Sequence, residues 1–249
     1  PDGTWVYVPT SLELDAMRAE SAISELLLTV TDDAGNTGAA STPLSVTIDT
    51  AAPSAPGAID LDSGSDTGVS NSDNVTSDTT PTVQGTGTAG DTITLYAPNG
   101  TTVLGTAVVD ATGNWAITPT TALPDGTTAL SVKATDPQGN TSAPGTVSVT
   151  IDTTAPAAPT AVLDSGSDTG NLGDSKTNDT TPTLSGTGEP DATITVKDAN
   201  GNVIATATVA SDGTWSATST ALPQGLNNLA ITATDAAGNT SPATPLTLV

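Results

Sequence analysis

A long internal repeat constrains the fold of this chain more than any other feature. The string IDTAAPSAP at residues 48–56 returns as IDTTAPAAP at residues 151–159, and LDSGSDTG occurs both at 61–68 and at 163–170. Looking for such periods comes first, because a missed repeat misassigns the whole fold. Two full units of roughly 100 residues therefore follow one partial unit.

We expect a partial first unit at residues 1–52, a middle unit at 53–155 and a last unit at 156–249. The first unit begins at a strand containing Trp5, and its segment PTSLELDAMRAESAISEL could form a helical turn. It lacks the strands that precede this Trp in the complete units. Either the chain is cut from a longer one, which would make it an internal segment, or those strands are supplied by another segment.

Alternating aliphatic residues predict short β-strands in each complete unit. In TALSVKATD, Leu130, Val132 and Ala134 face one way while the residues between them face the other, and NLAITATD repeats the pattern. About seven such strands per unit, separated by turn signals, are typical of an immunoglobulin-like sandwich. The sequence therefore predicts an all-β chain of tandem Ig-like β-sandwich domains in an extended array.

Composition excludes several function classes. The chain has no Cys and no His, which removes the disulfide between the sheets, the usual zinc ligands and the Ser-His or Cys-His nucleophile pairs. Aliphatic packing around one Trp per complete unit must then hold the two sheets together. A formal net charge of −23 disfavours nucleic acid and anionic lipid as partners. No apolar run is long enough to cross a bilayer, so no membrane insertion is expected.

One turn returns in every unit, as TDDAGN at 31–36, TDPQGN at 135–140 and TDAAGN at 234–239. Gly and Asn suit a tight turn, but turn geometry does not require the Asp before them. Counting strands A to G places this F–G turn at the N-terminal pole of its unit, and the long loop after strand A at the C-terminal pole. Asp136 should then lie near Asp49 of the preceding linker, and Asp235 near Asp152.

Aspartates also gather in the long loop after strand A, at the same spacing in both complete units. They are Asp62, Asp66, Asp73 and Asp78 in the middle unit, and Asp164, Asp168, Asp174 and Asp179 in the last unit. Close carboxylates repel each other by about 1 kcal/mol per pair at solvent-like dielectric, and a divalent cation removes that cost. Calcium takes six to eight oxygen ligands and needs neither His nor Cys. The spacing does not fit an EF-hand, and the alternative is that these aspartates are turn and capping residues.

The chain resembles the bacterial immunoglobulin-like repeats of giant adhesins that Gram-negative bacteria export by type I secretion. The resemblance rests on IDTTAPAAP, DSGSDTG, TNDTTPTLSGTGEPDATITV and TDAAGNTS, and it covers both complete units and the last strands of the first. It implies an extended extracellular stalk on the bacterial cell surface, made rigid by Ca²⁺ at and near the junctions between neighbouring repeats. The matching residues are Asp49 and Asp152 in the linkers, Asp136 and Asp235 in the F–G turns, and the two loop sets above.

Together these observations predict a non-enzymatic, calcium-stiffened stalk segment of a secreted adhesin, active in cell adhesion and biofilms. Two alternatives stay open. A ligand-binding or glycan-binding module would need exposed aromatic residues, which are scarce here, since aromatic residues make up 2% of the chain. An accessory domain of an extracellular hydrolase would need a catalytic domain in the same gene.

Overall fold

The computed structural model describes residues 23–46 and 48–249. The strand expected at Trp5 and most of the segment expected to form a helical turn lie outside this range. Within it every regular element is a β-strand, which confirms the predicted all-β class. None of the described elements is a helix long and apolar enough to span a membrane.

The middle unit is a sandwich of two sheets. Its strands are β3 (Gly57–Leu61), β4 (Val75–Thr76), β5 (Val83–Thr86), β6 (Thr92–Tyr96), β7 (Val103–Val108), β8 (Asn114–Ile117), β9 (Gly126–Thr135) and β10 (Gly145–Ile151). One sheet has the order β3-β5-β8 and the other the order β4-β10-β9-β6-β7. All pairings are antiparallel except that of β4 with β10. Within the long loop that carries the aspartates, the short strand β4 therefore pairs with the second sheet, and the chain returns to the first sheet at β5.

The last unit repeats this architecture. Its strands are β11 (Val162–Leu163), β12 (Thr183–Thr187), β13 (Thr193–Lys197), β14 (Val203–Thr208), β15 (Thr214–Thr218), β16 (Asn227–Thr234) and β17 (Thr244–Leu248). They form the sheets β11-β12-β15 and β14-β13-β16-β17. The counterpart of β4 is present only as two bonds, since Thr177 donates to the carbonyl of Val249 and Val249 donates to that of Ser175.

The inward faces of the strands form one apolar core in each complete unit. In β9 the buried residues are Leu130, Val132 and Ala134, as the alternation predicts. Trp115 and Trp215 are both 4% exposed, so each is a core residue. Their indole N–H groups, which need a partner when buried, donate to the carbonyls of Thr86 and Thr160 at 3.1 Å.

The first unit is described only from residue 23 onward. It contributes a two-stranded ribbon of β1 (Ile23–Leu26) and β2 (Leu44–Val46), with Leu27 54% and Val30 77% exposed. The described residues of this unit thus form no core of their own.

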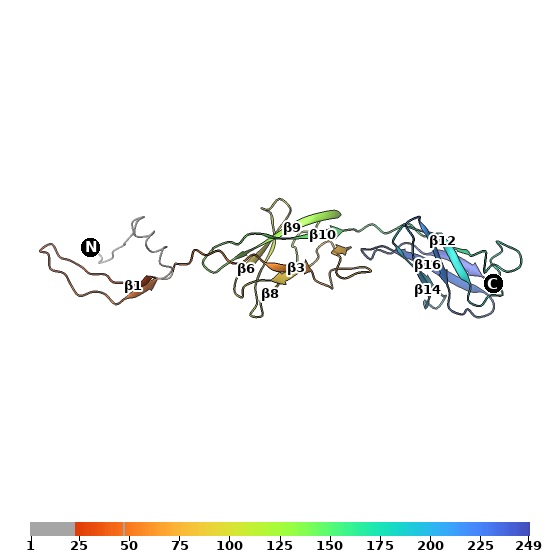
Figure 1. Cartoon of the computed structure of the whole chain (residues 1–249), viewed down its shortest axis with the longest axis horizontal. Coiled ribbons are helices and arrows are strands. Elements are labelled where there is room, and N and C mark those ends of the chain that lie inside the picture. Colours follow the sequence, from red (N-terminus) through yellow and green to blue (C-terminus); the bar gives the residue numbers. More distant parts are fainter. Residues whose placement is uncertain (1–22, 47) are drawn as a thin grey trace.

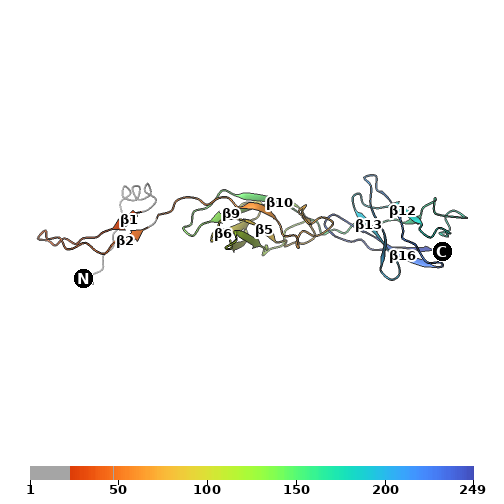
Figure 2. The same cartoon turned by 60° about the horizontal axis from the view of Figure 1, so that its bottom comes forward.

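The parts of the chain follow one another along a single axis. Figures 1 and 2 show the β1–β2 ribbon at one end, the middle unit next and the last unit at the other end, in both views. The polypeptide enters each complete unit at one pole and leaves it at the opposite pole. This arrangement confirms the expected extended array.

Candidate functional site

The repeated F–G turn is built by its own aspartate. Asp235 Oδ1 accepts the backbone N–H of Asn239 and Asp235 Oδ2 accepts its side-chain amide, both at 2.9 Å. The same pair of bonds joins Asp136 to Asn140 and Asp32 to Asn36. The expectation that turn geometry does not need this Asp is therefore wrong, because the Asp and the Asn close the turn together.

The same turn also occurs in the hairpin between β13 and β14. There Asp198 accepts both the backbone and the side-chain N–H groups of Asn202, and these bonds hold the pKa of Asp198 below its usual value. Desolvation raises the pKa of Asp136, but the hydrogen bonds from Asn140, Gln138 and Gly139 together outweigh it and the pKa is lowered. The Asp-x-x-Gly-Asn pattern is thus a turn motif that occurs in more than one hairpin, and it does not by itself indicate a metal site.

The F–G turns lie against the linkers, which confirms their predicted position at the N-terminal pole. The contact is made by the Asn and not by the Asp. Asn140 Nδ2 donates to the carbonyl oxygen of Asp49 at 3.1 Å, and Asn239 Nδ2 donates to that of Asp152 at 2.8 Å. The carboxylates of Asp49 and Asp152 each accept a backbone N–H two residues further along the linker. At both joints the linker therefore offers a carbonyl to the turn.

The loop after strand A reaches the next unit. Thr67 Oγ1 in the middle unit donates to the carbonyl oxygen of Ala237 in the F–G turn of the last unit, at 2.8 Å. Figure 1 shows this turn extending to the loop of the middle unit at the joint. The predicted position of the loop at the C-terminal pole is confirmed.

Six of the eight loop aspartates cap their own turns. Each accepts the backbone N–H two residues ahead through Oδ1: Asp62, Asp73, Asp78, Asp164, Asp174 and Asp179. In addition, the hydroxyl of Ser167 donates to Asp179 Oδ2 at 3.0 Å, which helps to lower the pKa of Asp179. For these six the turn-and-cap interpretation accounts for the side chain.

Asp66 and Asp168 differ from the other six. They are 4% and 7% exposed, and they occupy the same position in the two loops. In each, Oδ2 accepts one backbone N–H, from Asn74 in the first case and from Gly173 in the second. Oδ1 is buried in both and has no hydrogen-bond partner among the described residues. Burial raises the pKa of Asp66, and the charges of Asp73 and Asp60 raise it further.

A buried carboxylate oxygen without a partner is costly, and a cation would relieve that cost. Among residues 23–46 and 48–249, however, no three Asp, Glu, His or Cys side chains are grouped as a metal site. A cation at Asp66 or Asp168 would therefore have to take most of its ligands from backbone carbonyls, hydroxyl groups and water. Calcium accepts such ligands, so the donor set fits calcium better than a transition metal.

The structure singles out two further aspartates, Asp91 and Asp60, that the sequence did not predict as site residues. Asp91 is 3% exposed and its Oδ2 has no partner among the described residues. Its counterpart in the last unit is Ala192, so the repeat that pointed to the loop set gave no signal here. Asp60 lies on β3 close enough to Asp66 to raise its pKa. The sequence places Asp60 two residues before Asp62, but only the fold brings its charge close to Asp66.

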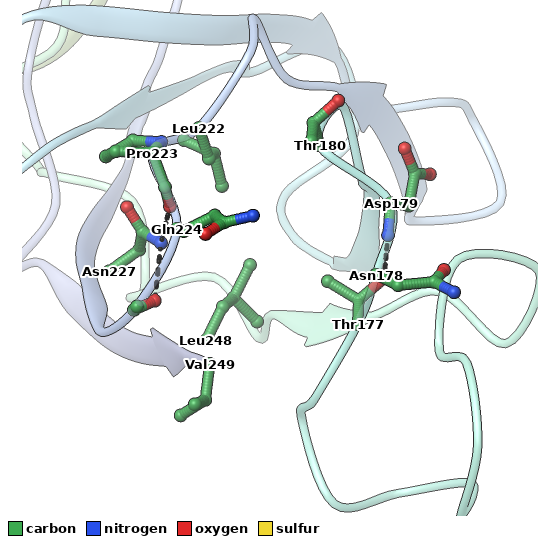
Figure 3. A pocket seen from close by; sticks show the side chains of 11 residues that line it. Thr177, Asn178, Asp179, Thr180, Leu222, Pro223, Gln224, Asn227, Leu248 and Val249 are labelled. Atoms are coloured by element: carbon green, nitrogen blue, oxygen red, sulfur yellow. Dashed lines mark hydrogen bonds between the residues drawn. The ribbon is translucent and has the colours of Figure 1, made fainter.

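The C-terminal pole of the last unit carries an open hollow. Figure 3 shows Thr177 and Asp179 on one side, with Leu222 and Pro223 on another and Leu248 beside Val249. The carboxylate of Asp179 points away from the apolar side chains, so it does not line the hollow as a ligand-binding group. At the same pole of the middle unit, Thr76, the counterpart of Thr177, is paired in the sheet with Ile151. Ile151 is 1% exposed.

Several solved structures are similar to the chain at low TM-scores. The structure described as a Ca²⁺-stabilized adhesin that helps an Antarctic bacterium bind ice is 27% identical, with a TM-score of 0.39, over 95% of this chain and 58% of that one. A 1.5-MDa bacterial ice-binding adhesin is 26% identical, with a TM-score of 0.35, over 88% and 70%. A biofilm-associated protein domain is 24% identical, with a TM-score of 0.29, over 70% and 28%. With TM-scores below 0.5, these similarities add nothing about function.

The chain spans between 28% and 58% of the length of the first three such structures. No curated protein matches the sequence. The sequence model of one family matches twice in tandem, at residues 53–153 and 154–249. Together the two matches cover most of the chain and both sandwiches. The chain therefore belongs to the bacterial Ig-like domain family.

Proposed function

We propose that this chain is a calcium-stiffened, non-enzymatic stalk segment of a large secreted adhesin on a bacterial cell surface. The observation that carries the proposal is the pair Asp66 and Asp168. Each is a buried carboxylate with one oxygen lacking a partner, at the same place in two successive units. The arrangement of the units in a row supports a spacer role, since a row of sandwiches sets a distance.

The loop after strand A would respond to calcium because its carboxylates are costly to bury without a counter-charge. Asp66 lies close to the charges of Asp73 and Asp60, and each of them repels its carboxylate. A bound calcium ion would supply the positive charge that offsets this repulsion. Asp66 and Asp168 would each hold an ion in the loop of their own unit. The turns capped by Asp62 and Asp164 would keep these loops in place.

The joints would stiffen because these loops and the F–G turns meet there. Thr67, next to Asp66, already contacts Ala237 of the next unit. Fixing the loop therefore fixes the contact. The carboxylates of Asp49, Asp136, Asp152 and Asp235 already accept protein N–H groups, so we propose that they act at the joints mainly by orienting carbonyl oxygens.

In the proposed life cycle, the chain stays loosely folded in the calcium-poor cytosol, passes through a type I secretion system and folds fully on meeting calcium outside the cell. Partners are then the neighbouring Ig-like repeats of the same chain, and the chain itself carries no catalytic site.

The test is thermal unfolding and small-angle X-ray scattering of the full chain, with calcium and with a chelator. At a free calcium concentration of about 100 times the dissociation constant, binding to one site stabilises by about 2.7 kcal/mol. We expect a higher melting temperature and a longer maximum dimension with calcium. Asp66→Asn and Asp168→Asn should each remove part of the calcium effect.

Asp198→Asn is the control, because Asp198 lies outside the loop after strand A and both of its carboxylate oxygens accept N–H groups of Asn202. It should leave the calcium effect intact. Identical melting temperatures and dimensions with and without chelator would rule the proposal out. A calcium effect that survives both Asp66→Asn and Asp168→Asn would move the site elsewhere.

A further inference from the structure

We infer that the tip of the loop after strand A is a socket for the F–G turn of the next unit, and that the fourth residue of that turn selects which unit fits. The socket comprises Asp66–Gly68 in the middle unit and Asp168–Gly170 in the last unit. The selecting residue is Ala34, Gln138 or Ala237 in the three turns. The inference rests on direct protein contacts and holds with or without calcium.

The occupied socket lies between the middle and last units. Thr67 Oγ1 accepts the backbone N–H of Ser77 at 2.9 Å, which positions the hydroxyl, and donates its proton to the carbonyl of Ala237. Gly68 has a φ of +113°, and a Cβ atom built there would overlap the carbonyl oxygen of Ala236. The backbone of the socket thus touches the backbone of the turn, which only glycine permits.

The fourth turn residue is sealed in this contact. Ala237 is 1% exposed, and the preceding Ala236 is exposed. A larger side chain at position 237 would have to push the socket away, because the methyl group of Ala237 is almost fully buried in the contact. The contact therefore has room for the small side chain of Ala at this position.

The turn of the middle unit carries Pro137 and Gln138 instead, and both are exposed. Gly139 has no atom within 4 Å of a Cβ built on it, whereas Gly238, its counterpart, lies against Gly68. No loop after strand A precedes this turn in this sequence, and the described contact ahead of the middle unit is the bond from Asn140 to the linker. Gln is larger than the sealed Ala237, so at the same place in an occupied socket its side chain would overpack the contact.

The socket of the last unit is built in the same way and is open. Thr169 Oγ1 accepts the backbone N–H of Asn178 at 2.8 Å, as Thr67 accepts that of Ser77. Gly170 has a φ of +91° and no atom within 4 Å of a Cβ built on it. Both key features of the occupied socket are thus present before any turn is bound.

The occupant we assign to this open socket is the F–G turn of another bacterial Ig-like unit with the pattern T-D-x-A-G-N. Two turns in this chain have it, at residues 31–36 and 234–239, and the turn at 135–140 does not. The open socket has the same Thr bond and the same glycine conformation as the socket already filled between the middle and last units. The fourth turn residue would then set the order in which units can join rigidly.

The first experiment measures the joint that exists. Because the chain has no Cys, spin labels can be placed at Thr106→Cys and Thr206→Cys, two exposed and equivalent strand positions. Electron–electron distance measurements on the full chain should give one narrow distribution. Ala237→Gln and Gly68→Ala should broaden it at least twofold. The matched controls Gln138→Ala and Gly170→Ala alter the same positions in the neighbouring unit and should leave it narrow.

All variants are measured with calcium and with chelator, which separates this inference from the proposed function. A distribution that stays narrow in chelator and broadens with Ala237→Gln supports the socket even if calcium has no effect. If Ala237→Gln and Gly68→Ala leave the width unchanged, the selecting role is wrong. If the unaltered chain is narrow only with calcium, the cation and not the socket holds the joint.

The second experiment fills the open socket. Residues 151–249 are appended after Val249 of the full chain, which restores the IDTTAP linker in the register it has after β10. Labels in the last unit and in the appended one should give a distribution as narrow as that of the existing joint. Gln at the position of Ala237 in the appended unit should broaden it. Equal widths for the two versions would show that the open socket does not read this residue.

Discussion

The two complete units have the same interior and different poles. Both have a three-stranded sheet against a larger one, a buried Trp at 4% exposure and a buried Asp in the loop after strand A. At the joint between them, Gly68 of the middle unit lies against the F–G turn of the last unit. The two units share the Asp-Thr-Gly of the socket and differ in the fourth residue of the turn, Gln138 against Ala237, so they differ in a residue that meets a neighbour and not in the core.

The largest expected effect tests whether the interiors are equivalent. Trp115→Ala and Trp215→Ala should each destabilise their own unit by about 3–5 kcal/mol, because each removes a buried aromatic side chain and its hydrogen bond. Differential scanning calorimetry should show one transition lowered in each variant. Costs that differ severalfold would mean that the two cores are not interchangeable.

The next effect concerns the buried carboxylate. Since the pKa of Asp66 in the folded state is raised above 3.8, the folded chain favours its protonated form. Its contribution to stability is therefore full at low pH and is lost as the pH rises through the folded pKa. In chelator, Asp66→Asn should stabilise the chain at neutral pH by about 1 kcal/mol and should flatten its pH dependence. Urea unfolding between pH 4 and pH 7 measures this.

Asp198→Asn is a control for which the expected change in stability at neutral pH has the opposite sign. Its pKa is lowered by the bonds from Asn202, so its contribution is present above the unfolded pKa and is lost as the pH falls through the folded one. Asp198→Asn should therefore destabilise at neutral pH. If Asp66→Asn also destabilises in chelator, its carboxylate is stabilised by something other than a cation.

A smaller effect distinguishes the two joints. Asn239→Ala should cost about 1 kcal/mol more than Asn140→Ala, because the bond from Asn239 to the linker is shorter, at 2.8 Å against 3.1 Å, and is partly buried. Urea unfolding measures the difference. Asn202→Ala removes the same turn bonds without a linker contact and gives the baseline. Equal costs for all three would show that neither linker bond contributes.

The smallest effect is expected at Lys176. Its ammonium lies 3.6 Å from Asp174 Oδ2 and its side chain is 64% exposed, so the ion pair contributes little. Lys176→Val introduces the residue found at the equivalent Val75 and should change the unfolding free energy by less than about 0.5 kcal/mol. A change well above that in thermal unfolding would indicate that this loop differs between the units beyond its sequence.

The core strands could be predicted because their signal is local. Leu130, Val132 and Ala134 alternate with polar neighbours, and period-2 alternation has one structural solution when one face is buried. The tilt of the long loop toward the next unit could also be predicted from strand counting. The partner of Asp136 could not be predicted from the sequence. Its carboxylate could bond Asn140 and close the turn, or it could contact the linker, and only the folded geometry shows that it bonds Asn140.

The loop aspartates also show that a sequence does not predict the hydrogen-bond partners of a carboxylate. Their matched spacing singled out eight residues, and six of them cap their own turns while Asp66 and Asp168 are buried with one oxygen unpaired. A sequence reports which residues carry carboxylates but not how many N–H groups each one meets. Asp91 was missed for the same reason, because its burial depends on the packing of distant strands.

By itself the sequence determined the all-β class, the strand alternation, the net negative charge and the poles at which the turns and loops lie. These follow from periodicity and from composition, which act over short stretches of chain. Only the tertiary structure decided which carboxylates are buried, that Asn bonds the linker, and that Gly68 meets Ala237 of the next unit. The linker bonds join residues 91 and 87 positions apart and the bond from Thr67 to Ala237 joins residues 170 positions apart, and their energies depend on distances that no local pattern encodes.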